Sequence, residues 1–324
     1  MKFFENTNID FVKWRWHAIG LSLAIVIAGA IAISRGMLPL GVDFAGGTIV
    51  VVKFQQHVPV ERVRPAISAL PNGAGNDAVV QEYGDSSQNQ VLIRVGKTGE
   101  ESAGKLSEVA DMVVNTLKQA NLGSFEVINT EIVGPVVGEQ LKRQGTLATI
   151  FAMGGILIYI AFRFQLSFAV GAIAATLHDL LITLAFLAFF RYDMTLNVIA
   201  GLLTITGYSV NDTIVIFDRV RENMRNMRRE SLTTIVNVAV NQTLSRTVIT
   251  AGTTLLSVVA LYLFGGEVLE GFAFTMLVGI ISGTYSTVFI AAAIAIMLQG
   301  RKPIKGQIAA PAATERKPGR RRAS

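Results

Sequence analysis

Six long apolar runs divide this chain, and they constrain its fold more than any other feature. The runs are 17–34, 146–162, 166–190, 194–217, 247–264 and 272–298. Each is close to the roughly 20 residues that a helix needs to cross a hydrocarbon layer about 30 Å thick. A chain in lipid must satisfy its backbone hydrogen bonds within itself. The sequence therefore predicts a membrane α-helical protein with six transmembrane helices.

The composition supports this class and excludes several kinds of chemistry. Apolar residues make up 51% of the chain and charged residues 16%, whereas a soluble domain carries about 25% charged residues. The chain has no cysteine, which excludes disulfides, thiol catalysis and cysteine-bound metals. The three histidines, His17, His57 and His178, are too scattered for the ligand spacing of a zinc site. We expect neither a metal nor a cofactor.

The basic residues predict how the chain is oriented in the membrane. The segment 218–246 holds six arginines and the tail 299–324 is strongly basic, whereas residues 42–140 hold 12 acidic and 7 basic residues. Basic segments are retained in the cytoplasm. We therefore expect residues 1–16, the 218–246 loop and the tail on the cytoplasmic side, and 41–143 on the opposite side. The tail contains several prolines and is expected to be disordered.

The segment 41–143 has the pattern of a soluble domain. Its β-branched and alternating stretches predict strands, and its amphipathic stretches predict helices. The expected strands are 47–55, 78–83, 90–95 and 124–133, and the expected helices are 59–70 and 100–120. The order β-α-β-β-α-β is that of an α+β ferredoxin-like domain, here inserted between the first two spans. This fold occurs with many functions and does not define one.

The fourth apolar run contains a carboxylate in a place where charge is costly. Asp212 lies within it, and Thr204, Tyr208 and Asn211 share its face of the expected helix. Arg246 directly precedes the fifth run. Burying Asp or Arg at the middle of a bilayer costs about 2.5–3.5 kcal/mol on insertion scales. We therefore expect these side chains to face the interior of the bundle and to meet partners there.

Two interpretations of Asp212 and Arg246 follow from the residues alone. In the first, Asp212 is a proton relay whose protonation changes with its desolvation and its distance from Arg246, while Arg246 stays charged. In the second, the two form a structural ion pair, or Arg246 extends to the membrane edge. We favour the relay.

A second polar pair, His178 and Asp179, lies near the centre of the third run. A packed histidine–carboxylate contact that ties helices together explains it as well as a supporting role in the relay. Adjacent residues point in different directions on a helix, so the two need not act together.

The sequence after the first span carries a family resemblance. Gly41, Asp43, Phe44, Gly46 and Gly47 form the pattern Gly-x-Asp-Phe-x-Gly-Gly, which resembles the glycine-rich signature of the SecD/SecF family of protein-export membrane proteins. The stretch 207–223 resembles the fourth span of SecF-type members and its exit. Further similar segments are 132–138, 244–247, 261–266 and 269–272. The resemblance covers roughly residues 10–300.

This resemblance implies a function and partners. SecF-type members of the family, which belongs to the resistance-nodulation-division superfamily, pair with SecD and associate with the SecYEG channel and other Sec subunits. They use the proton-motive force to promote translocation of unfolded secretory polypeptides across the bacterial inner membrane. The resemblance therefore implies that 41–143 is periplasmic and that Asp212 and Arg246 couple protons to transport. We expect Gly46 and Gly47 to act as a hinge for the periplasmic domain.

Other functions fit the same features less well. The chain could be half of a proton-driven exporter of small molecules or lipids from the same superfamily, or a scaffold subunit that moves no protons. No catalytic constellation or phosphate-binding loop is present, so we do not expect an enzyme. The basic residues lie in tails and loops, which argues against a nucleic-acid partner.

Overall fold

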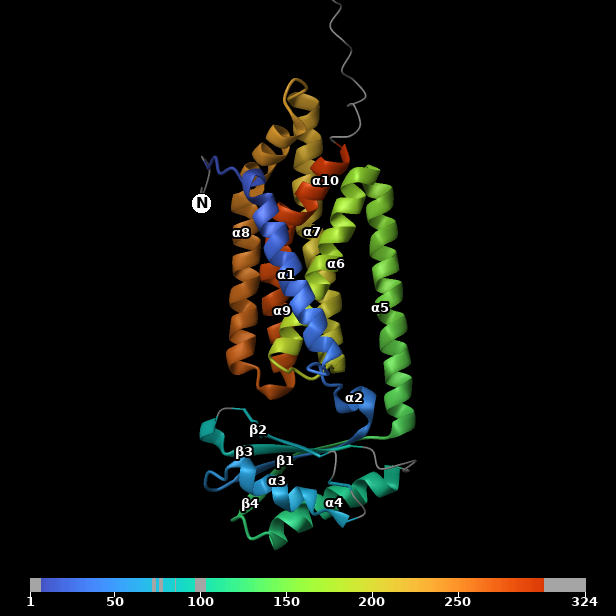
Figure 1. Cartoon of the computed structure of the whole chain (residues 1–324), viewed down its shortest axis with the longest axis vertical. Coiled ribbons are helices and arrows are strands. Elements are labelled where there is room, and N and C mark those ends of the chain that lie inside the picture. The colour runs from blue at the N-terminus through green and yellow to red at the C-terminus, as the bar shows by residue number, and fades with distance from the viewer. Residues whose placement is uncertain (1–6, 72–73, 76–77, 85, 97–102, 300–324) are drawn as a thin grey trace, which may run out of the picture.

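The protein consists of a bundle of long helices joined to a small α+β domain (Figure 1). The computed structural model describes residues 7–71, 74–75, 78–84, 86–96 and 103–299. Among these, six helices or helical runs are long and apolar enough to cross a membrane. They confirm the expected fold class. The expected disordered tail lies outside the described residues, apart from its first residue, which ends the last helix.

The spanning helices are long, and the last one is interrupted. They are α1 (Arg15–Ser34), α5 (Pro135–Arg163), α6 (Leu166–Phe189), α7 (Leu196–Asn226), α8 (Leu232–Phe264) and α9 (Glu267–Ser286). A π-helical turn, Thr287–Ala291, joins α9 to α10 (Ala292–Gln299), so that the three together form the sixth span. A short 3-10 helix, Val12–Trp14, precedes α1.

Several helices extend beyond the apolar runs. The segment 218–246, expected as a loop, is mostly helical, because α7 continues to Asn226 and α8 begins at Leu232. The Ser231 hydroxyl accepts a hydrogen bond from the Thr234 amide and so caps α8. Likewise α5 begins at Pro135, inside the segment expected as part of the soluble domain. Hydropathy marks only the part of a helix that lies in lipid, so the runs understate the helix lengths.

The soluble domain has the predicted ferredoxin-like topology. Its elements are β1 (Gly47–Phe54), α3 (Val60–Ser68), β2 (Val79–Tyr83), β3 (Gln90–Val95), α4 (Ala103–Gln119) and β4 (Phe125–Val133). The sheet has the order β2-β3-β1-β4, and all its neighbouring strands are antiparallel. The helices α3 and α4 cover one face, and the sheet lies between them and the bundle (Figure 1).

The core of this domain follows from the alternation in its strands. Val50, Val52 and Ile93 of the central strands are fully buried against Val113 and Leu117 of α4. Full burial of each such side chain contributes about 1.5–3 kcal/mol. Since the chain has no cysteine, this apolar core stabilises the domain without covalent cross-links.

The bundle is packed unevenly. In the apolar stretches of α6 and of the sixth span, 50% and 56% of the residues are buried, against 6% in α5 and 11% in α8. The helices α6, α7 and α9 therefore form the inner part of the bundle, whereas α5 and α8 expose most of their surface within this chain.

Close packing of α9 on α7 depends on glycine. A Cβ atom at Gly279 would lie 2.1 Å from Cδ1 of Ile205, a side chain that is fully buried. Small residues of this kind let membrane helices approach closely.

We predict that Gly279→Val separates α9 from α7 and destabilises the bundle by about 1–3 kcal/mol, the usual effect of overpacking. Thermal unfolding of the purified protein in detergent measures this. The matched control is Gly20→Val on the exposed side of α1, where an added Cβ meets nothing within 4 Å. Equal stability of the two variants would refute the close contact.

Candidate functional site

Asp212 lies on α7 with only one of its carboxylate oxygens bonded. The Thr247 hydroxyl of α8 donates to its Oδ1 at 2.8 Å. Its Oδ2 is buried and has no hydrogen-bond partner among the described residues. A buried polar atom without a partner is uncommon because its desolvation is not compensated. Asp212 therefore keeps an oxygen that can gain a proton.

Arg246 lies on α8, one residue before Thr247, the residue that donates to Asp212. Its side chain is exposed within this chain, and it makes no direct ion pair with Asp212 in the part of the protein described. The structural ion pair considered from the sequence is thus not formed in this conformation. The guanidinium remains close enough to attract the carboxylate.

The other polar residues predicted on the Asp212 face have different surroundings. Tyr208 is half-buried and packs against the apolar cluster formed by α7, α8 and α9. Thr204 donates to the Ala200 carbonyl at 2.7 Å and is exposed, as is Asn211. The structure therefore does not bring Thr204 and Asn211 to Asp212 but leaves them on an open face of α7.

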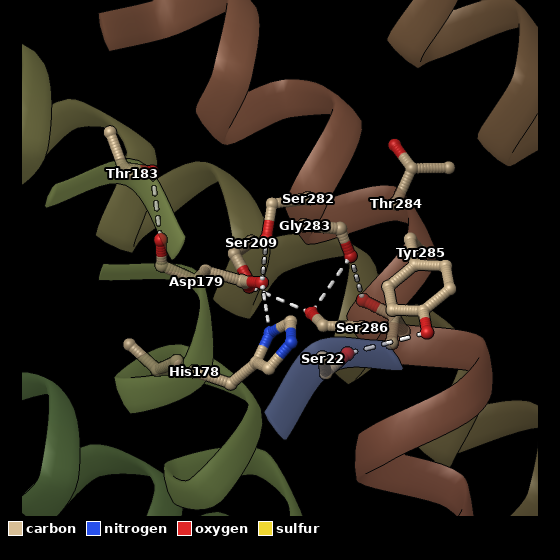
Figure 2. Close-up of polar contacts among 12 residues, drawn as sticks. Ser22, His178, Asp179, Thr183, Ser209, Ser282, Gly283, Thr284, Tyr285 and Ser286 are labelled. Atoms are coloured by element: carbon tan, nitrogen blue, oxygen red, sulfur yellow. Dashed lines mark hydrogen bonds and ion pairs between the residues drawn. The ribbon is translucent and has the colours of Figure 1, made fainter. Parts of the chain in front are cut away.

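Asp179 has the opposite environment (Figure 2). It is 1% exposed. Its Oδ2 accepts from Ser209 at 2.5 Å and Ser286 at 2.7 Å, and its Oδ1 accepts from Ser282 at 2.7 Å. His178 Nδ1 lies 3.0 Å from the same Oδ1, so the adjacent pair does make contact. We call Asp179 with these four residues the Asp179 cluster.

The three serines of this cluster were not predicted. They come from α7 and α9, and only the spacing of Ser282 and Ser286, one helical turn apart in an apolar stretch, could have indicated a common polar face. Each oxygen of Asp179 has two partners, whereas Asp212 has one bond in total. Carboxylates placed in such different environments take different roles. The hydrogen bonds of Asp179 suit a residue that links helices, and the unpartnered oxygen of Asp212 suits a residue that binds and releases a proton.

The glycine-rich motif holds the start of α7. Its residues Val42–Ala45 form one helical turn, α2. Asp43 Oδ2 accepts from the Leu196 amide, the first of α7, at 2.9 Å, which suits the positive end of a helix. The Gly41 amide donates to the Met194 carbonyl at 2.8 Å. Phe44 is buried and lies near Gly145 of α5.

The backbone conformation at the last two residues of the motif requires glycine. Gly46 and Gly47 have φ angles of 71° and 130°, which L side chains rarely adopt. A Cβ at Gly47 would also lie 2.6 Å from the Val95 carbonyl oxygen. Their role as a hinge stays a prediction.

A second tie joins the soluble domain to the bundle. Arg94, near the end of β3, forms an ion pair with Asp193 in the turn between α6 and α7. Its guanidinium also donates to the Leu40 carbonyl at 3.0 Å. The Arg94 side chain is only 10% exposed. Sequence reasoning missed this pair, because the two residues are far apart in the chain.

Near this tie, Tyr192 donates to Glu270 Oε1 at 2.6 Å, and its hydroxyl lies 3.2 Å from that of Tyr262. Burial, followed by the hydrogen bond to Glu270, raises the pKa of Tyr192 above its usual range. The hydroxyl therefore stays protonated and links α9 to the turn before α7. The described residues contain no group of three or more metal-ligating side chains placed to hold an ion.

Comparison with known proteins agrees with this architecture. The family description "Protein export membrane protein SecD/SecF, C-terminal" matches residues 113–301, and "SecD/SecF GG Motif" matches residues 38–58. The chain belongs to the SecD/SecF family. Curated relatives named "Protein translocase subunit SecF" include those of Koribacter versatilis, 37% identical over 98% of this chain and 98% of its own length, and Magnetococcus marinus, 43% identical over 91% and 94%. The Escherichia coli O157:H7 relative is 36% identical over 89% and 87%. Within this family, the present chain is therefore a SecF subunit of the protein translocase.

Solved structures of SecDF share the fold. The crystal structure of SecDF from Thermus thermophilus, described as a translocon-associated membrane protein, matches with a TM-score of 0.81 at 32% identity. SecDF in the Super-membrane-facing form matches with a TM-score of 0.64 at 32% identity. These matches cover 93% and 91% of this SecF-type chain, which spans 40% and 39% of the SecDF chains.

We predict that Asp193→Asn destabilises the contact between the soluble domain and the bundle, because it leaves the Arg94 charge buried without its partner. Breaking a buried ion pair of this kind costs about 3–5 kcal/mol. Hydrogen exchange of β3 and of the first turn of α7 measures the loosening. The control is Glu222→Gln, which removes an exposed pair with Arg219 on α7. Unchanged exchange in the Asp193 variant would contradict the tie.

Proposed function

We propose that this SecF chain works with SecD to couple the proton-motive force to the movement of unfolded secretory polypeptides through the SecYEG channel. The observation that carries the proposal is the buried, unpartnered Oδ2 of Asp212 on α7. The same helix is held at its start by Asp43 of the glycine-rich motif. The helix α7 therefore carries the carboxylate whose charge can change and is also bonded to the motif that leads into the soluble domain.

The proton step follows from the surroundings of Asp212. As an anion it is attracted by Arg246 and accepts from Thr247. Proton binding at Oδ2 removes the charge, and with it both the desolvation cost and the attraction to Arg246. The packing of α7 on α8 that stabilises the Asp212 anion is then no longer favoured. The helices α7 and α8 shift, and α7 carries the movement to the soluble domain.

The driving force is large enough for this step. One charge that crosses a potential of 100 mV releases about 2.3 kcal/mol. Conformers of one protein commonly differ by a few kcal/mol. A single proton per cycle can therefore shift the balance between two packings of α7 and α8.

The exposed surfaces of the bundle support a SecD partner. The helices α5 and α8 are barely buried within this chain. Thr204 and Asn211 of α7 and Arg246 of α8 are exposed at the level of the spans. Polar side chains are unfavourable against lipid, so partner helices with complementary polar groups would cover this face. The SecDF structures contain more chain than this protein spans.

The charge distribution supports the orientation expected from the sequence. The arginines that follow the lipid-spanning part of α7 lie at the end of the bundle opposite to the sheet (Figure 1). We place this end in the cytoplasm and the ferredoxin-like domain in the periplasm of a bacterium, with the spans in the inner membrane.

We predict that Asp212→Asn, which cannot exchange a proton, loses the gradient-dependent part of polypeptide export and retains assembly with SecD. The measurement is export of a reporter in inner-membrane vesicles that contain SecD, with and without an imposed proton gradient. The matched control is Asp218→Asn on the same helix. Asp218 is paired with Arg163 of α5 through bonds of 2.7 and 2.8 Å, so its neutralisation should leave the gradient response in place.

Two outcomes would contradict the proposal. A gradient response like that of the wild type would make Asp212 a packing residue and the chain a scaffold. A gradient-driven efflux of small molecules or lipids, with export unaffected by either variant, would support the exporter instead.

A further inference from the structure

The two intramembrane carboxylates are linked through α7. Ser209, one turn before Asp212, is fully buried and donates to Asp179 of α6. Thr213, the residue after Asp212, is also buried, and its hydroxyl lies 3.2 Å from that of Thr287. Asp212 is thus flanked on α7 by two buried hydroxyls that bond to neighbouring helices. These two contacts lie on either side of Asp212 and so constrain the rotation of α7 about its own axis at this point.

The helix α9 bonds to the same carboxylate, and the turn that follows it provides Thr287. Ser282 and Ser286, four residues apart, lie on one face and both donate to Asp179. The π-helical turn begins directly afterwards, at Thr287. Its widened turn is closed by the Ala292 amide, which donates to the Thr287 carbonyl. Single π turns occur mostly at functional sites.

We propose that Asp179 is the positioning residue for Asp212. Its carboxylate holds α7 through Ser209 and α9 through Ser282 and Ser286, so that Thr287 can reach Thr213 and Asp212 faces Thr247 of α8. Asp179 itself touches no transported proton in this scheme, because both of its oxygens already have two partners. The inference rests on the proposed function only for its consequence in export.

The scheme distinguishes the donors of the Asp179 cluster. Loss of the Ser209 hydroxyl releases α7, which can then rotate and separate Asp212 from Thr247. Loss of the Ser282 hydroxyl removes one hydrogen bond from the same carboxylate but leaves the tie to α7 in place. The two variants are matched in chemistry and differ in the helix that they release.

The test measures how accessible Asp212 is in the full chain assembled with SecD in vesicles. A hydrophobic carbodiimide modifies protonated carboxyl groups in lipid, and peptide mass analysis reports the labelled fraction at Asp212. At constant pH we expect Ser209→Ala to label about threefold faster or more than the wild type, the factor of a single net hydrogen bond. Ser209→Thr, which restores the hydroxyl, should return the rate to that of the wild type, and Ser282→Ala should leave it unchanged.

Each result decides the matter. Faster labelling in Ser209→Ala with rescue by threonine supports the positioning role, as does faster labelling in the nearly isosteric Thr213→Val if Ser209→Ala fails to assemble. Equal acceleration in Ser209→Ala and Ser282→Ala would overturn it, because the cluster would then act on the bundle as a whole. Unchanged labelling in Ser209→Ala and Thr213→Val would overturn it as well.

The same samples separate this inference from the proposed function. If Asp212→Asn leaves gradient-driven export intact, the proton coupling fails, yet the labelling rates still report whether Asp179 orients Asp212. If coupling holds but labelling does not respond to Ser209, only the positioning role fails.

Discussion

Asp179, an almost fully buried carboxylate, needs hydrogen-bond donors around it to offset its desolvation, and this constraint organises the centre of the membrane bundle. Asp179 satisfies it with Ser209, Ser282, Ser286 and His178. Removal of any one donor takes a hydrogen bond from a carboxylate that lies in a low-dielectric interior. The crossing of α6, α7 and α9 is therefore specified by polar geometry, to which glycine contacts such as that of Gly279 with Ile205 add close packing.

The helix α7 connects this fixed centre to the soluble domain. Its first turn is bonded to Asp43, its middle to Asp179 through Ser209, and its next turn carries Asp212. A rigid helix with contacts along its length moves as a unit. A change at Asp212 thus has a mechanical route to the ferredoxin-like domain that does not depend on the flexibility of a loop.

The sequence predicted what is periodic and missed what depends on distant partners. Six spans and the β-α-β-β-α-β order follow from apolar runs and strand alternation. Asp212 and Asp179 stood out because charge is rare in such runs, whereas serine is common in membrane helices, so the partners of Asp179 were invisible until three helices were assembled. The pair of Arg94 with Asp193 was missed for the same reason. The extensions of α7 and α8 were missed because hydropathy ends where lipid ends.

The ties at the base of the domain limit how it can move. A free hinge at Gly46 and Gly47 would let the domain swing without α7, but Arg94 joins the domain to the segment that begins α7. Asp43, which precedes the glycines, joins α2 to the start of α7. Rotation about the glycines would have to break the Arg94 pair, whose burial makes separation costly. Movement of the domain together with α7 breaks neither tie. The geometry therefore favours a lever in which the glycines shape the backbone, and the domain follows the helix that carries Asp212.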